Sequence, residues 1–215
     1  NDKLEETSIT VVNKRHPDEM YDILEPLTEI APYCHFRGRT LTGGTTPVFT
    51  RKFDNHIYGL KGKEIFSKAD IDWGGYEFPG NMKEHKFSCM ELLRYCLENK
   101  YVCAISNVVE SESSILFSTN LAGIFILDKV SQDIVHYETV MNVDYGIPMP
   151  NYMFVESSNN RIFFVYPAYE LFKMKENLKN NPEKRKRCPE KCLSLLEQIT
   201  EESNPVIFSY DFGKK

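Results

Sequence analysis

The sequence predicts a mainly β protein built from antiparallel meanders, with a few helical insertions. In residues 101–166, short β-branched and aromatic runs alternate with Ser, Asn, Asp and Gly, which is typical of strands and turns. A second observation is a faint repeat of strand–turn–strand units along the chain. The 215 residues suffice for one core. We therefore expect a single β-rich domain over 1–215, in which 176–187 form an exposed charged insertion.

The N-terminal third is predicted to combine a strand, a helix and a group of strands. Residues 8–13 (SITVVN) have the composition of a short strand. Pro17 suits the first turn of a helix, and the apolar residues after it keep helical spacing until Pro26, which should end the helix. Residues 35–69 are expected to form four strands, with a tight turn at Asp54-Asn55.

Two more helices and a final strand are predicted further along. Ser88 and Glu91 have the spacing of a capping box at the start of a helix over 88–98. Pro189 opens a second helix, in which the apolar residues form one stripe. The last apolar run, PVIFSYDF at 205–212, is predicted to be a strand.

The repeat consists of a strand, a polar turn, a second strand with an Ile–aromatic pair, a break and a third strand. Its units open at Pro47, Ile115 and Tyr152, and Pro205 could open a fourth. The pairs are Ile57-Tyr58, Ile124-Phe125 and Ile162-Phe163. Such meanders build a β-propeller, here of about four or five small blades, in which residues 8–13 could close the ring beside the last strand. They equally build a β-sandwich or barrel, and the sequence leaves these alternatives open.

The cysteines indicate an oxidising compartment. An even number fits three disulfides, although six buried thiols would give the same count. The cysteines are Cys34, Cys89, Cys96, Cys103, Cys188 and Cys192. The chain starts at Asn1, as it would after removal of a signal peptide or in a trimmed fragment. Without a run of 18 apolar residues, no membrane span is expected. We therefore expect a secreted, extracellular protein.

Charge is unevenly distributed along the chain. The net charge of −5 argues against nucleic acid as a partner. Residues 173–191 carry eight cationic side chains against three glutamates, and residues 1–30 are acidic. The densest basic patch is Lys184, Arg185, Lys186 and Arg187. It could bind a polyanion such as a heparin-like glycan, or it could simply be a solvated surface.

Two loops rich in aromatic residues, glycine and proline are candidate contact surfaces. They cover residues 70–81, which contain the only tryptophan, and residues 145–152. The candidate ligand-binding residues are Trp73, Tyr76, Phe78, Tyr145 and Tyr152. Rigid rings on such loops can hold a sugar, a flat ligand or a protein surface. The alternative is that the loops fold inward and plug the space under the sheets.

Motifs for catalysis are weak. Residues 42–45 resemble a phosphate-binding loop only in glycine content and lack its lysine, and neither a nucleophile elbow nor a zinc-protease helix occurs. Asp70-x-Asp72 could hold a divalent cation through carboxylate oxygens. Cys188 and Cys192 have zinc-like spacing, but the other cysteines do not supply a matching pair. We expect no cofactor.

Together, these features favour a secreted, disulfide-stabilised binding protein without catalytic activity. Its surface loops would contact a protein, a glycan or a small-molecule ligand. One alternative is a β-fold hydrolase with an acidic, metal-assisted site. Another is a structural component that assembles with further copies of itself.

Overall fold

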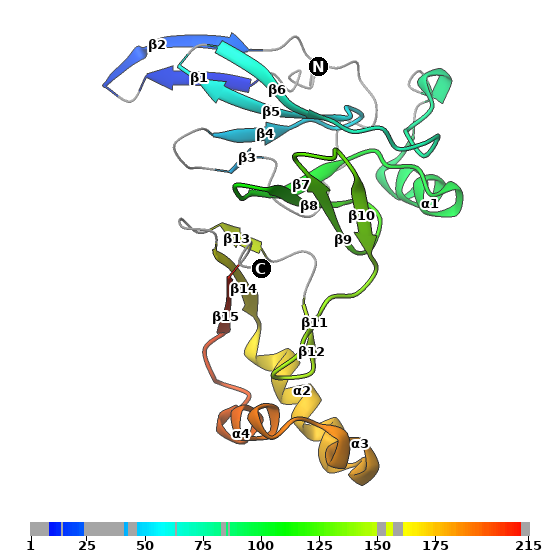
Figure 1. Cartoon of the computed structure of the whole chain (residues 1–215), viewed down its shortest axis with the longest axis vertical. Helices are drawn as coiled ribbons and strands as arrows, with labels where there is room; N and C mark the ends of the chain where they lie inside the picture. The colour runs from blue at the N-terminus through cyan, green and yellow to red at the C-terminus, as the bar shows by residue number, and fades with distance from the viewer. Residues whose placement is uncertain are drawn as a thin grey trace. The chain divides into compact units, whose positions relative to one another are not determined.

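The computed structural model confirms a mainly β chain of antiparallel meanders with few helices (Figure 1). It describes residues 9–13, 15–23, 41–42, 47–62, 64–82, 85, 87–149, 154–156 and 161–211. The chain divides into two compact units, one of residues 1–105 with 119–121 and one of residues 106–118 with 122–215. Within the described ranges, no helix combines the length and apolar character needed to cross a membrane.

The first unit begins with a two-stranded hairpin. Strands β1 (Ile9–Asn13) and β2 (His16–Ile23) pair antiparallel, with Ile9 opposite Ile23. The helix predicted from Pro17 is therefore wrong, because its expected residues form β2. The closure of a ring by residues 8–13 beside the last strand stays a prediction. The helical spacing of the apolar residues placed Met20 in the core, whereas its side chain is 63% exposed. Backbone pairing with β1 overrides the weak local preference for a helix.

A four-stranded sheet follows, with strands in chain order (Figure 1). It comprises β3 (Leu41–Thr42), β4 (Val48–Thr50), β5 (His56–Lys61) and β6 (Glu64–Asp70). All three residues of β4 are buried, as are Ile57 and Ala69 on the neighbouring strands. The strands predicted within residues 35–69 are thus confirmed for the parts that the structure describes.

A short 3-10 helix (Gly80–Met82) precedes α1 (Cys89–Asn99), which begins with the predicted capping box. The Ser88 hydroxyl accepts a hydrogen bond from the Glu91 amide, and the Glu91 carboxylate accepts one from the Ser88 amide. The helix ends at Lys100, whose backbone is left-handed with φ of 59°. Its buried face joins a small core cluster, whose buried members are Phe53, Phe78, Leu92, Cys96 and Cys103.

The second sheet is another four-stranded meander, in the order β10-β9-β8-β7. Its strands are β7 (Ile105–Glu110), β8 (Ser114–Thr119), β9 (Ile124–Asp128) and β10 (Ile134–Tyr137). Buried polar groups are paired within it, since the Asn107 amide donates to the Ser118 hydroxyl at 2.8 Å. The short strands β11 (Met141–Asn142) and β12 (Ile147–Pro148) then pair with each other.

The third sheet, β13-β14-β15, contains a helical insertion between its last two strands. Strands β13 (Phe154–Glu156) and β14 (Arg161–Tyr166) lead into α2 (Ala168–Lys179), α3 (Pro182–Arg187) and α4 (Glu190–Gln198), and β15 (Val206–Asp211) follows. Residues 168–175 were expected to be the third strand of the repeat unit that opens at Tyr152. They instead belong to helix α2. Strand β15 instead pairs with β14, as β6 pairs with β5 and β10 with β9.

The sequence repeat corresponds to equivalent positions in the three sheets. Ile57, Ile124 and Ile162 lie on β5, β9 and β14 and are 0%, 2% and 2% exposed. In two of the sheets the neighbouring ring stacks on the preceding strand, Phe49 on Tyr58 at 5.1 Å and Phe117 on Phe125 at 5.5 Å between centroids. The shared pattern is thus a buried isoleucine beside a cross-strand pair.

Candidate binding pocket in the helical insertion

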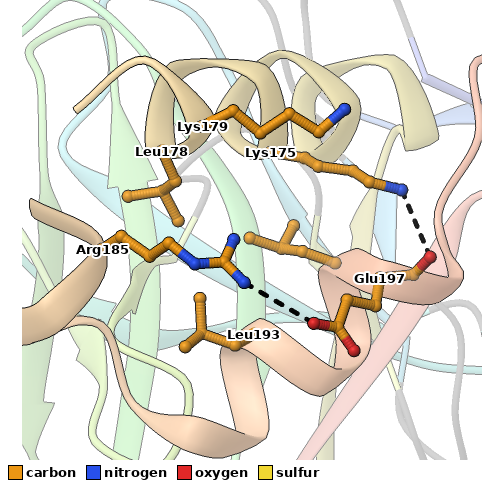
Figure 2. A pocket seen from close by; sticks show the side chains of 7 residues that line it. Lys175, Leu178, Lys179, Arg185, Leu193 and Glu197 are labelled. Carbon is orange, nitrogen blue, oxygen red and sulfur yellow. Dashed lines mark hydrogen bonds and ion pairs between the residues drawn. The ribbon is translucent and has the colours of Figure 1, made fainter. Parts of the chain in front are cut away.

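The helices α2, α3 and α4 surround a pocket of about 210 Å³ in the second unit (Figure 2). Both apolar and charged side chains line it. The lining residues are Lys175, Leu178, Lys179, Arg185, Leu193, Leu196 and Glu197.

Helical spacing brings these side chains together. Lys175, Leu178 and Lys179 follow an i, i+3, i+4 pattern on α2 and therefore share one face. Residues 193, 196 and 197 repeat this pattern on α4. Leu178 and Leu196 are 7% and 2% exposed and belong to the main core cluster of the unit. The apolar wall of the pocket is consequently held in place by the core.

Fixed hydrogen bonds and ion pairs orient the charged groups. The Lys175 ammonium donates to the backbone carbonyls of Glu197 at 3.2 Å and of Ile199 at 2.6 Å, at the end of α4. Such carbonyls lack helical partners and carry the negative end of the helix dipole. Arg185 Nη2 lies 3.6 Å from Glu197 Oε1 (Figure 2), and Lys179 pairs with Glu176 at 2.6 Å. Two of the three lining cations thus pair with carboxylates and Lys175 binds carbonyls, which leaves one positive charge in excess.

The predicted basic patch lies beside this pocket. Lys184, Arg185, Lys186 and Arg187 occupy the last turn of α3, and all four are exposed. Only Arg185 among them lines the pocket, whereas Lys186 forms an ion pair with Glu183 at 2.9 Å. The insertion predicted at 176–187 is therefore the end of α2 followed by α3.

In the aromatic loop of residues 70–81, two of the candidate rings follow the inward-folded alternative. Trp73 and Phe78 are 8% and 5% exposed, so their rings cannot offer a surface platform to a ligand. The Trp73 indole donates to the Asn55 side chain at 3.1 Å, and the Phe78 ring lies 4.9 Å from Phe53. The loop folds inward because burying these rings stabilises the core more than exposing them would.

The other aromatic candidates differ in their surroundings. Tyr76 is 52% exposed and stays a predicted contact residue. Tyr145 is half-buried, and its ring packs edge-on against Phe208 with centroids 5.3 Å apart. Tyr152 lies outside the described residues.

The two carboxylates of the predicted pair make separate local contacts. Asp70 Oδ1 accepts a hydrogen bond from Ser67 and lies 3.4 Å from His56 Nε2. Asp72 Oδ1 accepts the backbone N–H of Gly74 at 2.8 Å, which closes a turn. Across the ranges described, no group of three or more His, Cys, Asp or Glu side chains could hold a metal ion.

A second polar cluster surrounds His56 on β5. Its Nδ1 lies 2.5 Å from Asp54 Oδ1, and the Tyr58 hydroxyl donates to Asp54 Oδ2 at 2.7 Å. Burial, reinforced by this hydrogen bond and by the negative charge of Asp54, raises the pKa of Tyr58 to about 12. The phenol is therefore neutral at physiological pH and acts as a hydrogen-bond donor.

No disulfide joins the cysteines that the structure describes, in contrast to the predicted bridges. These cysteines are Cys89, Cys96, Cys103, Cys188 and Cys192, and Cys34 lies outside the described residues. A hydrogen bond from Cys103 lowers the pKa of Cys96. Burial and a hydrogen bond with Cys188 raise the pKa of Cys192 to about 12. The five described cysteines therefore lie in or beside the two cores.

Comparisons with known proteins bear on the fold. No protein-family model matches the sequence, and no curated protein matches it. The fold is similar to the 2.60 Å crystal structure of a Bacteroides fragilis NCTC 9343 protein named "Putative exported protein", with a TM-score of 0.54 and 18% sequence identity. The match covers 82% of this chain and 49% of the other, so the chain spans about half the length of that protein. At this identity the similarity shows a shared β-rich fold.

Proposed function

We propose that the protein is an exported, non-catalytic binding protein that takes an anionic ligand at the pocket of its helical insertion. The observation that carries the proposal is the excess positive charge of this pocket beside a leucine wall. Charge-assisted hydrogen bonds to Arg and Lys are among the strongest that a binding site can offer an anion.

The arrangement of the cations supports binding. Lys175 is held by two carbonyls and Arg185 lies close to Glu197. Ordered side chains lose less conformational entropy when a ligand arrives, so more of the interaction energy contributes to affinity. The three consecutive helices also place these groups around one small volume.

The fold supports a scaffold role for the sheets. Four-stranded meanders in chain order are the unit of a β-propeller, and two of them, β3–β6 and β7–β10, follow one another along this chain. We infer that they are blades of a propeller and that the third sheet carries its site in an insertion. Binding residues are commonly placed on segments that a rigid scaffold supports.

Export is supported by the name of the Bacteroides protein, which shares the fold. Fractionation of the source cells tests this part of the proposal. We expect the full-length protein outside the cytosol, and its exclusive recovery with cytosolic proteins would contradict export.

Ligand binding is tested by thermal unfolding with short carboxylates, phosphate and a heparin oligosaccharide at constant ionic strength. A ligand that binds the native state stabilises it by about 2.7 kcal/mol at a hundred times its Kd. We expect at least one anion to raise the Tm of the wild type and of Lys186→Ala, and to raise that of Arg185→Ala less. Equal effects on all three proteins, or none, would refute anion binding at this pocket.

A further inference from the structure

We infer that the pocket binds a small monocarboxylate with a short branched aliphatic chain, such as 3-methylbutanoate. This inference rests on the proposed anion binding and specifies the ligand class. Three properties of the pocket lead to it: its volume, its charge and its leucine wall.

The volume restricts the ligand to a small molecule. Sites for drug-sized ligands typically measure about 300–1,000 Å³, whereas this pocket measures about 210 Å³. A ligand of a few carbon and oxygen atoms, such as 3-methylbutanoate, suits a space of this size. A folded protein domain or a long glycan could contact only the rim.

The charges favour one negative group. The Arg185 guanidinium and the Lys175 ammonium provide donors for a carboxylate, and the lining cations with their partners carry one positive charge in excess. A second negative group on the ligand would face the Glu197 carboxylate, which already lies in the lining. A monoanion is therefore favoured over a dicarboxylate or a phosphate.

The leucines favour an apolar chain on that anion. Leu178 and Leu196 are almost completely buried, whereas Leu193 is half-buried and offers surface to a ligand. Each methylene group transferred from water into such surroundings improves binding up to about fourfold. Because the pocket is open on one side, we expect 3-methylbutanoate to bind about tenfold more tightly than acetate.

Isothermal titration of the intact protein with matched ligands tests the inference. The ligands are 3-methylbutanoate, acetate, which lacks the chain, and 3-methylbutan-1-ol, which lacks the charge. We expect one molecule of 3-methylbutanoate to bind per chain, and both of the other ligands to bind at least about tenfold more weakly. Equal affinity for acetate and 3-methylbutanoate would overturn the role of the leucines, and binding of the alcohol as tight as that of the acid would overturn the role of the cations.

Matched variants locate the binding. Arg185→Ala should weaken binding of 3-methylbutanoate by about tenfold or more, the cost of losing one charge-assisted hydrogen bond. Lys186→Ala removes a charge from the same helix outside the pocket and should leave the affinity unchanged. Leu193→Phe should block the pocket and abolish binding. Far-UV circular dichroism of this variant checks that it is folded. Lys179→Ala, which preserves all leucines, provides a second test if Leu193→Phe does not fold.

The outcomes also separate this inference from the proposed function. Suppose that a heparin oligosaccharide binds, that its binding is weakened by Arg185→Ala but not by Leu193→Phe, and that 3-methylbutanoate does not bind. The insertion then binds polyanions, and the ligand class inferred here is wrong. If no anion binds, both the inference and the proposed function fail.

Discussion

The equivalence of the three sheets predicts similar energetic roles for Ile57, Ile124 and Ile162. Each is 0–2% exposed and lies in the strand that pairs on both sides. Ile→Val at each position removes one buried methyl group and should cost about 0.5–1.5 kcal/mol of unfolding free energy. Ile207→Val on β15 is the matched control, since this side chain is 65% exposed and should cost less than about 0.5 kcal/mol.

Urea unfolding at equilibrium measures these costs. Trp73 is the only tryptophan and lies in the first unit, so its fluorescence reports Ile57→Val, while circular dichroism reports the other variants. An unchanged denaturant dependence would confirm that only stability has changed. If any of the three core variants costs no more than Ile207→Val, the sheets do not share equivalent buried positions.

Three further predictions concern individual side chains. Ser88→Ala removes the capping box of α1 and should cost about 1 kcal/mol in denaturant unfolding, whereas an unchanged midpoint would show that the cap contributes nothing. Because the pKa of Tyr58 is raised from 10.0 to about 12, its stabilising effect is complete below pH 10 and disappears as pH rises through 12. Over this range the wild type should lose stability more steeply than Tyr58→Phe, and parallel curves would contradict the role of the Asp54 hydrogen bond. Cys192 is fully buried and its pKa is raised, so iodoacetamide should modify the half-buried Cys188 first at pH 8. Peptide mass spectrometry measures the order of modification. Earlier modification of Cys192 would refute the environment assigned to it.

The sequence predicted the elements whose signals are local. The capping box at Ser88 fixes the start of α1 through two hydrogen bonds within four residues. Runs of β-branched and aromatic residues predicted most strands of residues 101–166. In β7 and β8 these runs are continuous because both faces of the strand are buried.

Elements decided by distant contacts were not predictable. Residues 16–23 carry apolar side chains at helical spacing, yet they pair with β1 as a strand. In α2 the aromatic residues Tyr169 and Phe172 resemble those of a strand, although the segment packs as a helix with α4 around the core. Local propensity is a weak guide where such packing decides the structure.

The candidate site was predicted only in part for the same reason. The charge run identified Arg185, but Lys175 was assigned to the end of the strand-rich region and Leu178 to an exposed insertion. Their shared face on α2 was therefore not foreseen. The inward orientation of Trp73 depends on Asn55, 18 residues earlier in the chain. Loop composition cannot reveal such a partner, so the sequence left open whether the loop is exposed or folded inward.

A methyl NMR titration of the leucine-labelled protein with 3-methylbutanoate tests the central claim most directly. Anion binding at the helical insertion predicts saturable shifts for the methyl groups of Leu178, Leu193 and Leu196, and much weaker shifts in Arg185→Ala. The exposed Leu97 on α1 serves as an internal reference and should not shift. Unchanged spectra, or saturable shifts confined to leucines outside the insertion, would contradict the account.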